Sequence, residues 1–192
     1  NDTRPDRLYR NNHNGTFTDM SVAAGVAYSE SGATRAGMGV DAGDYDHSGR
    51  QGLLVGTFTN EGMVLYHNEG DGRFHDASLT SGLATDTLRS LTFGAFFFDY
   101  DLDGLLDIFA ANGHVADDIS VTQPSLSYAE PPLLFHNLGH GRFEDVTGGV
   151  GPDLRRRMVA RGADYADIDL DGDLDVSVAT SNASAPLFRN DN

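Results

Sequence analysis

Two sequence elements alternate along this 192-residue chain, and their spacing limits the folds that it can adopt. One element reads Leu, Tyr or Phe, any residue, Asn, and it begins at Leu8, Leu65, Leu134 and Leu187. The other is a Gly that lies five residues before an acidic loop, and the loops begin at Asp44, Asp99 and Asp167. Loops that start 55 and 68 residues apart are too widely spaced for ankyrin or leucine-rich repeats. The spacing fits a unit of four short strands, as in a propeller blade.

The middle unit divides into four predicted strands. The first, Thr92–Phe98, is almost continuously apolar, as expected for a strand that neighbouring sheets cover on both faces. After the acidic loop come Leu105–Ala111, Leu133–His136 and Arg142–Val146, and an Asn- and Gly-rich turn joins the last two. No segment shows a sustained helical stripe with caps, so we expect no long helix.

We therefore predict an all-β chain, a partial β-propeller of four-stranded antiparallel blades with an acidic loop between strands one and two of each blade. Closed propellers have about four to eight blades, so a segment of a longer propeller is expected rather than three blades that close on themselves. The single predicted segment, 1–192, comprises the end of a preceding blade and a linker (1–36), a blade (37–78), a blade with a loop insertion at 112–132 (92–146), and an incomplete blade (159–192).

The second and third acidic loops have the composition of calcium sites. Asp occupies positions 1, 3, 5 and 9 of both loops, and Gly at position 6 permits a sharp reversal of the chain. Calcium takes six to eight oxygen ligands, and we expect side chains from positions 1, 3 and 5, the backbone carbonyl of position 7, and a bidentate carboxylate at position 9. The predicted ligands are Asp99, Asp101, Asp103, Leu105 and Asp107 in the second loop, and Asp167, Asp169, Asp171, Asp173 and Asp175 in the third.

Two other interpretations of these loops are weaker. Asp and Gly are common in solvated turns, but four like charges at the same spacing in two loops would oppose folding without a cation. An EF-hand needs Glu at position 12 and flanking helices, whereas position 12 here is Ala110 or Val178.

The first acidic loop is less complete than the other two. Gly52 replaces the acid of position 9, so we expect a third calcium site that is weak or empty. Its predicted ligands are Asp44, Asp46, Ser48 and, through the backbone at position 7, Arg50.

The combined pattern resembles the FG-GAP/VCBS repeats of integrin-α-like β-propellers and, within them, the ASPIC/UnbV and cartilage-acidic-protein-like family. Phe93-Gly94-Ala95 matches the FG-GAP signature, and the Leu-Tyr/Phe-x-Asn element is followed by Gly-x-Phe-x-Asp in three copies. This resemblance implies a calcium ion in the loop between the first two strands of a blade, which agrees with the ligands assigned above.

Charge and composition exclude several classes of protein. The net charge is −16, with 24 Asp, 5 Glu, 13 Arg and no Lys, so nucleic acid is not an expected partner. No apolar run approaches the roughly 18 residues of a membrane-spanning helix, and we expect a chain without a transmembrane segment. The absence of Cys excludes disulfides and thiol nucleophiles.

These observations favour a non-enzymatic calcium-binding scaffold for interaction or adhesion, secreted to an extracellular or periplasmic location. The expected partner is a protein or a glycan, the remaining blades of the same propeller, or a neighbouring subunit. Two alternatives stay open: an accessory subunit of a larger assembly, and a carbohydrate-active propeller enzyme. An enzyme would need two carboxylates in one cleft, and the candidates outside the calcium loops are Asp117, Asp118, Glu130 and Asp164.

Overall fold

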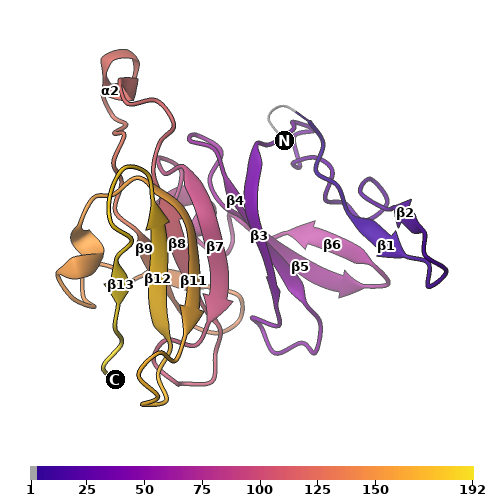
Figure 1. The fold of residues 1–192 in the computed structure, drawn as a ribbon. Helices are drawn as coiled ribbons and strands as arrows, with labels where there is room; N and C mark the ends of the chain where they lie inside the picture. The colour runs from indigo at the N-terminus through magenta and orange to yellow at the C-terminus, as the bar shows by residue number, and fades with distance from the viewer. Residues whose placement is uncertain (1–3) are drawn as a thin grey trace.

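The computed structural model describes residues 4–192, so the first three residues of the predicted segment 1–36 lie outside the described part. The described chain forms antiparallel sheets of two, four, four and three strands, in chain order. Figure 1 shows the sheets arranged side by side, with β7 between β3 and β11. The all-β class and the four-stranded antiparallel sheets are confirmed. The arrangement is consistent with a propeller-like fold, although no sheet closes on itself within residues 4–192.

The first half of the chain contains a two-stranded hairpin and a four-stranded sheet. Between β5 and β6 the chain reverses through Asp71 and Gly72, both with positive φ (53° and 72°). An Asp-Gly pair suits such a turn because it tolerates left-handed backbone at both positions. The strands are β1 (Tyr9–Asn11), β2 (Phe17–Asp19), β3 (Gly37–Gly43), β4 (Gly52–Thr57), β5 (Val64–Gly70) and β6 (Arg73–Asp76).

The second half of the chain contains a four-stranded and a three-stranded sheet. The predicted first strand of the middle unit has the bounds of β7, and helices within residues 4–192 are short turns of three or four residues. The strands are β7 (Thr92–Phe98), β8 (Asp107–Asn112), β9 (Leu133–Asn137), β10 (Phe143–Asp145), β11 (Ala160–Ala166), β12 (Asp175–Thr180) and β13 (Leu187–Phe188). The helical turns are α1 (Leu83–Asp86), α2 (Ile119–Thr122) and η1 (Asp153–Arg155).

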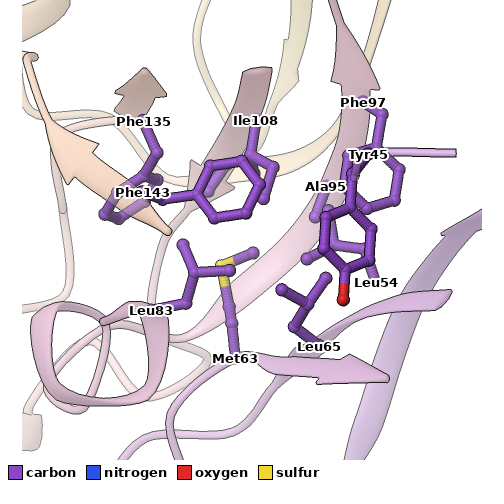
Figure 2. Packing of buried hydrophobic residues seen from close by; sticks show 11 residues of the cluster. Tyr45, Leu54, Met63, Leu65, Leu83, Ala95, Phe97, Ile108, Phe135 and Phe143 are labelled. Atoms are coloured by element: carbon purple, nitrogen blue, oxygen red, sulfur yellow. The ribbon is translucent and has the colours of Figure 1, made fainter. Parts of the chain in front are cut away.

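Strand β7 is apolar after Thr92 because its two faces belong to two different cores. Ala95 and Phe97 join the core between the two four-stranded sheets, where the ring of Tyr45 stacks on Phe97 at a centroid distance of 5.7 Å (Figure 2). Phe96 and Phe98 face the other way and pack in the core shared with the three-stranded sheet. Side chains alternate across a strand, so a strand with two covered faces needs apolar residues at every position.

The Gly that recurs before each acidic loop marks the place where first strands of neighbouring sheets approach each other. A Cβ on Gly39 would lie 2.5 Å from the carbonyl oxygen of Phe93, and a Cβ on Gly94 would lie 2.8 Å from the backbone nitrogen of Ala163. At Gly162, the third copy, a Cβ would meet nothing within 4 Å. The repeated Gly therefore permits backbone-to-backbone packing between sheets.

The 112–132 insertion connects the second four-stranded sheet to the elements on both sides of it. Glu130 and Met158 exchange backbone hydrogen bonds of 2.8 and 2.9 Å, and Met158 lies two residues before the first residue of β11. On the opposite side, the amide of Asn60 donates to Gln123 over 3.3 Å, and the ring of Phe58 meets His114 edge-on. The insertion therefore contacts elements of three sheets and is not a free loop.

The glycine contacts yield a matched pair of substitutions. We expect Gly94→Ala to lower the free energy of unfolding by about 1–3 kcal/mol, because its methyl group would overlap the backbone of β11. Gly162→Ala should change the free energy by less than about 0.5 kcal/mol, since its Cβ has open space. Urea unfolding of both variants measures the difference, and equal effects would contradict the close approach of the strands.

Glu130 yields a prediction on pH. Its side chain is 4% exposed, and one carboxylate oxygen accepts the Leu91 N–H while the other has no partner. Burial raises the pKa of Glu130 from 4.5 to about 7, so the folded chain holds a proton that the unfolded chain releases. Stability from this group is therefore complete below pH 4.5 and is lost as the pH rises through 7.

We expect the wild type to lose about 2 kcal/mol of stability relative to Glu130→Gln between pH 5 and pH 8. Urea unfolding at both pH values measures this difference, and the subtraction removes the contributions of the other carboxylates. Parallel pH profiles for the two proteins would show that the Glu130 carboxyl is not desolvated.

Candidate metal centres

The three acidic loops occupy equivalent places, between the first and second strands of the three larger sheets. Their backbones also match. Position 4 is left-handed in every loop, with φ of 57° at His47, 58° at Leu102 and 64° at Leu170. Position 6 is a Gly with φ of 78°, 89° and 106° in chain order, a conformation that favours Gly. The shared sequence pattern therefore produces one loop conformation three times.

The carboxylate of position 1 closes each loop. One oxygen of Asp44, Asp99 and Asp167 accepts the N–H of the Gly at position 6 over 2.9, 2.9 and 3.2 Å. This bond folds the loop back on its first residue, so the side chains of positions 1, 3 and 5 project into the same concave turn. The loop conformation is thus part of the reason that the charges converge.

The acids of positions 1, 3 and 5 lie together in both complete loops. Each of the two triads has carboxylate oxygens within 4.8 Å of one another. One oxygen of each triad, Oδ1 of Asp101 and Oδ1 of Asp167, is buried without a hydrogen-bond donor, and so is Oδ1 of Asp44 in the first loop. Buried acceptors without donors are costly, and hard oxygen donors in this number fit a divalent cation such as Ca²⁺. The triads are Asp99, Asp101 and Asp103, and Asp167, Asp169 and Asp171.

Mutual repulsion is visible in the third loop. Desolvation, and then the neighbouring Asp171 carboxylate, raise the pKa of Asp169. A cation between the two groups would reverse this effect, because a nearby positive charge favours the ionised form of both acids.

The acid of position 9 has a structural role that the sequence did not reveal. Both oxygens of Asp107 accept backbone N–H groups, from Tyr100 over 3.1 Å and from Asn137 over 2.7 Å. Asp175 repeats the arrangement with Ile168 and Asn190 over 3.1 and 2.9 Å. A carboxylate oxygen has two lone pairs, so bidentate binding of calcium by these acids stays a prediction, as do the carbonyl ligands of Leu105 and Asp173.

Asp107 is fully buried, and this burial raises its pKa to about 6 even though hydrogen bonds from Asn137 and Tyr100 act in the opposite direction. The loop therefore contains a carboxylate that water does not solvate. A cation beside it would stabilise its charged form.

The first loop differs from the others for steric reasons. A Cβ on Gly52, at position 9, would lie 2.4 Å from the ring of Tyr45 and 2.8 Å from the carbonyl oxygen of Tyr66. An acid therefore has no space at this position. Asp41, which precedes the loop, directs its carboxylate to the neighbouring sheet, where it accepts the Phe97 N–H over 2.8 Å.

The remaining predicted ligands of the first loop already have hydrogen-bond partners within the protein. Burial would raise the pKa of Asp46, but hydrogen bonds from Ser48 and His67 outweigh it and lower the pKa. Arg50, at position 7, directs its side chain to the carbonyl oxygen of Asn68 over 2.8 Å. This loop thus has fewer uncompensated charges than the other two.

A basic residue from the third strand approaches position 3 of every loop. His67 Nδ1 lies 2.8 Å from Asp46, and His136 Nδ1 lies 3.3 Å from Asp101. In the third loop, Arg189 lies 3.9 Å from Asp169. The sequence signal was the residue before Asn in the Leu-Tyr/Phe-x-Asn element, which is Arg or His in all four copies.

Two copies of the Asn in this element, Asn137 and Asn190, join neighbouring sheets. The side-chain amide of Asn137 donates to the carbonyl oxygens of Tyr45 and Leu106 over 2.9 and 2.8 Å, and the Asn190 amide donates to Tyr100 over 2.7 Å. Tyr45 and Tyr100 hold position 2 in the loop of the preceding sheet. Each such Asn therefore fixes one acidic loop against the next sheet.

The candidate acids of the enzyme alternative are dispersed. Asp117, Asp118 and Asp164 are exposed, whereas Glu130 is buried beside Leu91. A cavity of about 580 Å³ lies between the second four-stranded sheet and the three-stranded sheet, and none of the four acids lines it. Its walls combine aromatic rings such as Phe98, Phe109 and Phe188 with polar groups from residues 189–192.

Comparison with known protein families identifies a repeat that includes the second and third acidic loops. The sequence pattern described as an FG-GAP-like repeat matches residues 99–178, from the first acid of the second loop to β12. An FG-GAP-like repeat is therefore present. The narrower resemblance to the ASPIC/UnbV and cartilage-acidic-protein-like family stays a prediction. No curated protein matches the chain, and no helix within residues 4–192 is long and apolar enough to cross a membrane.

One solved structure that is similar to the chain comes from a study of an Agrocybe aegerita lectin and its specific recognition of non-reducing terminal N-acetylglucosamine. The sequences are 18% identical, and the TM-score is 0.47. The match covers 99% of this chain but only 54% of the lectin chain. This chain therefore spans about half the length of that structure.

The Asn contacts between sheets yield a testable substitution. Asn137 is 1% exposed, and Asn137→Ala would leave two carbonyl groups without their donor. We expect a loss of about 2–4 kcal/mol in the free energy of unfolding. Asn68→Ala is the matched control, because Asn68 is half-buried and its amide donates to Gln51 within the same sheet. Urea unfolding compares the two, and an equal loss would contradict the role of Asn137 between sheets.

Proposed function

We propose that this chain is a calcium-stabilised, propeller-type interaction scaffold without catalytic activity, secreted to an extracellular or periplasmic location. The observation that carries the proposal is the pair of loops in which acids of positions 1, 3 and 5 converge around buried oxygens without donors. The FG-GAP-like repeat that includes both complete loops supports the scaffold role. The two predicted calcium ions would occupy these loops, and the first loop would hold its ion weakly or not at all.

Calcium in this scaffold has a structural task. Each ion would neutralise carboxylates of one loop and hold the first strand of a sheet to the second. Because the loop conformation exists only in the folded chain, binding stabilises the fold by mass action. Dissociation constants of about 10⁻⁴ to 10⁻³ M are adequate for extracellular modules, which fits loops that contribute few ligands besides short acidic side chains.

The surfaces at the two ends of the sheet stack suit an interaction role. The hairpin β1–β2 exposes Tyr9 and Phe17 by 56% and 64%, and β13 at the other end exposes Leu187 by 52%. Large apolar side chains exposed in this way favour contact with a macromolecule. A protein, a glycan, further blades or a neighbouring subunit of a larger assembly would each meet the chain at these surfaces.

Thermal unfolding with and without calcium tests the proposal. At ten times the dissociation constant, each occupied site adds about 1.4 kcal/mol, so two sites should raise Tm by roughly 5–10 °C above the value in chelator. Asp103→Asn and Asp171→Asn should each remove about half of this increase, because each takes a charged ligand from one loop.

Ser48→Ala is the matched control, since Ser48 holds the same position 5 in the first loop. It should leave the calcium-dependent increase in Tm unchanged. A wild type whose Tm is the same in calcium and in chelator would remove the structural role of calcium.

A further inference from the structure

The third strand places a histidine, His136, beside the second acidic loop, whereas it places an arginine, Arg189, beside the third. His136 on β9 places Nδ1 3.3 Å from Asp101 Oδ2 and 3.3 Å from Asp107 Oδ1. The ligand atoms of these three residues lie within 4.8 Å of one another. We propose that Asp101, Asp107 and His136 form a mixed nitrogen and oxygen site for a divalent transition-metal ion of the zinc class, distinct in its donor set from the calcium sites of the proposed function.

The two distances from His136 Nδ1 match tetrahedral coordination. Ligand atoms at 2.0–2.1 Å from a tetrahedral zinc ion are separated by about 3.3 Å. Both measured separations from His136 Nδ1 have this value. Three protein ligands with a fourth position for water are a common zinc arrangement, and imidazole with carboxylate suits zinc and cobalt better than it suits calcium.

The hydrogen bonding of these atoms also points to a ligand. Nδ1 of His136 is buried and has no hydrogen-bond partner, and the same holds for Oδ1 of Asp101, the oxygen of that carboxylate that does not face His136. Nδ1 is equidistant from the two acidic oxygens but has bonding geometry to neither. A ring nitrogen placed between two carboxylate oxygens is the arrangement that a shared metal ion requires.

The site is held in position before any ion binds. Asp107 begins β8, and backbone N–H groups of Tyr100 and Asn137 fix its carboxylate. His136 lies within β9, and the ring of Tyr100 packs against the imidazole edge-on at 6.0 Å. Ligands on strands, with supporting contacts of their own, give a metal site its precision.

The other two loops lack this combination. In the first, His67 faces Asp46, but Gly52 takes the place of Asp107. In the third, the residue that corresponds to His136 is Arg189, and a guanidinium does not ligate a metal. Among the described residues, the pairing of an imidazole with both acids occurs in the second loop alone.

Cobalt binding to the full chain tests the site. We expect wild-type protein at pH 7.5 to bind Co²⁺ with the intense visible absorption of four-coordinate cobalt, and Zn²⁺ to displace it. His136→Arg should weaken Co²⁺ binding more than about tenfold and abolish that absorption. This variant keeps a positive charge beside Asp101, as Arg189 does beside Asp169, so it separates metal ligation from a simple ion pair.

The reciprocal variant Arg189→His should add a second cobalt site, because Asp169 and the buried Asp175 correspond to Asp101 and Asp107. Circular dichroism and Tm in chelator verify that both variants fold. Equal Co²⁺ affinity in the wild type and His136→Arg would overturn the site, and so would a wild type that binds no Co²⁺ at millimolar concentration.

The result is separable from the calcium proposal, although the two ions share Asp101 and Asp107. If calcium binds the second loop, it should raise the apparent dissociation constant for Co²⁺. If cobalt binding depends on His136 while Tm is the same with and without calcium, the result would support this site and refute the structural role of calcium. A calcium-dependent Tm with no effect of His136→Arg on cobalt would do the reverse.

Discussion

A chain of hydrogen bonds through Asn137 holds the acidic loops and the sheets in one arrangement. Its N–H donates to the buried carboxylate of Asp107, and its side-chain amide donates to Tyr45 in the loop of the preceding sheet. One residue therefore fixes the end of its own loop, the third strand and the neighbouring sheet. Asn190 repeats these bonds to Asp175 and Tyr100. The geometry of each candidate metal site depends on this connection, because it places the third strand and its basic residue beside the loop.

The sequence predicted the architecture well where local pattern and packing agree. The strand β7 could be recognised from its nearly continuous apolar run, since a strand covered on both faces has few polar positions. The acidic loops were equally visible, because position 6 needs Gly for its backbone. By contrast, the bond from Asp41 to Phe97 and the contacts of Asp107 join residues that only the folded chain brings together. Spacing in sequence carries no information on such partners.

Gly52 shows how packing and chemistry compete for one position. In the sequence, Gly52 stands at position 9, where the other two loops have Asp. In the structure, a Cβ at this position would collide with the Tyr45 ring and the Tyr66 carbonyl oxygen. Tyr45 in turn stacks on Phe97 in the core between the sheets. The Tyr45 ring thus occupies the space that the side chain of an acid at position 9 would need. The packing of Tyr45 in the core is therefore a reason for the lower charge of the first loop.

The basic residues of the third strands give the three acidic loops different surroundings. The first loop has two acids and His67, the second has four acids and His136, and the third has five acids and Arg189. Each loop receives one basic side chain, while the number of acids in the loop increases along the chain. An imidazole can also be a ligand in its neutral form, whereas a guanidinium remains a cation at every accessible pH. The alternation of His and Arg therefore determines whether a loop has a possible donor atom or a fixed positive charge beside its acids.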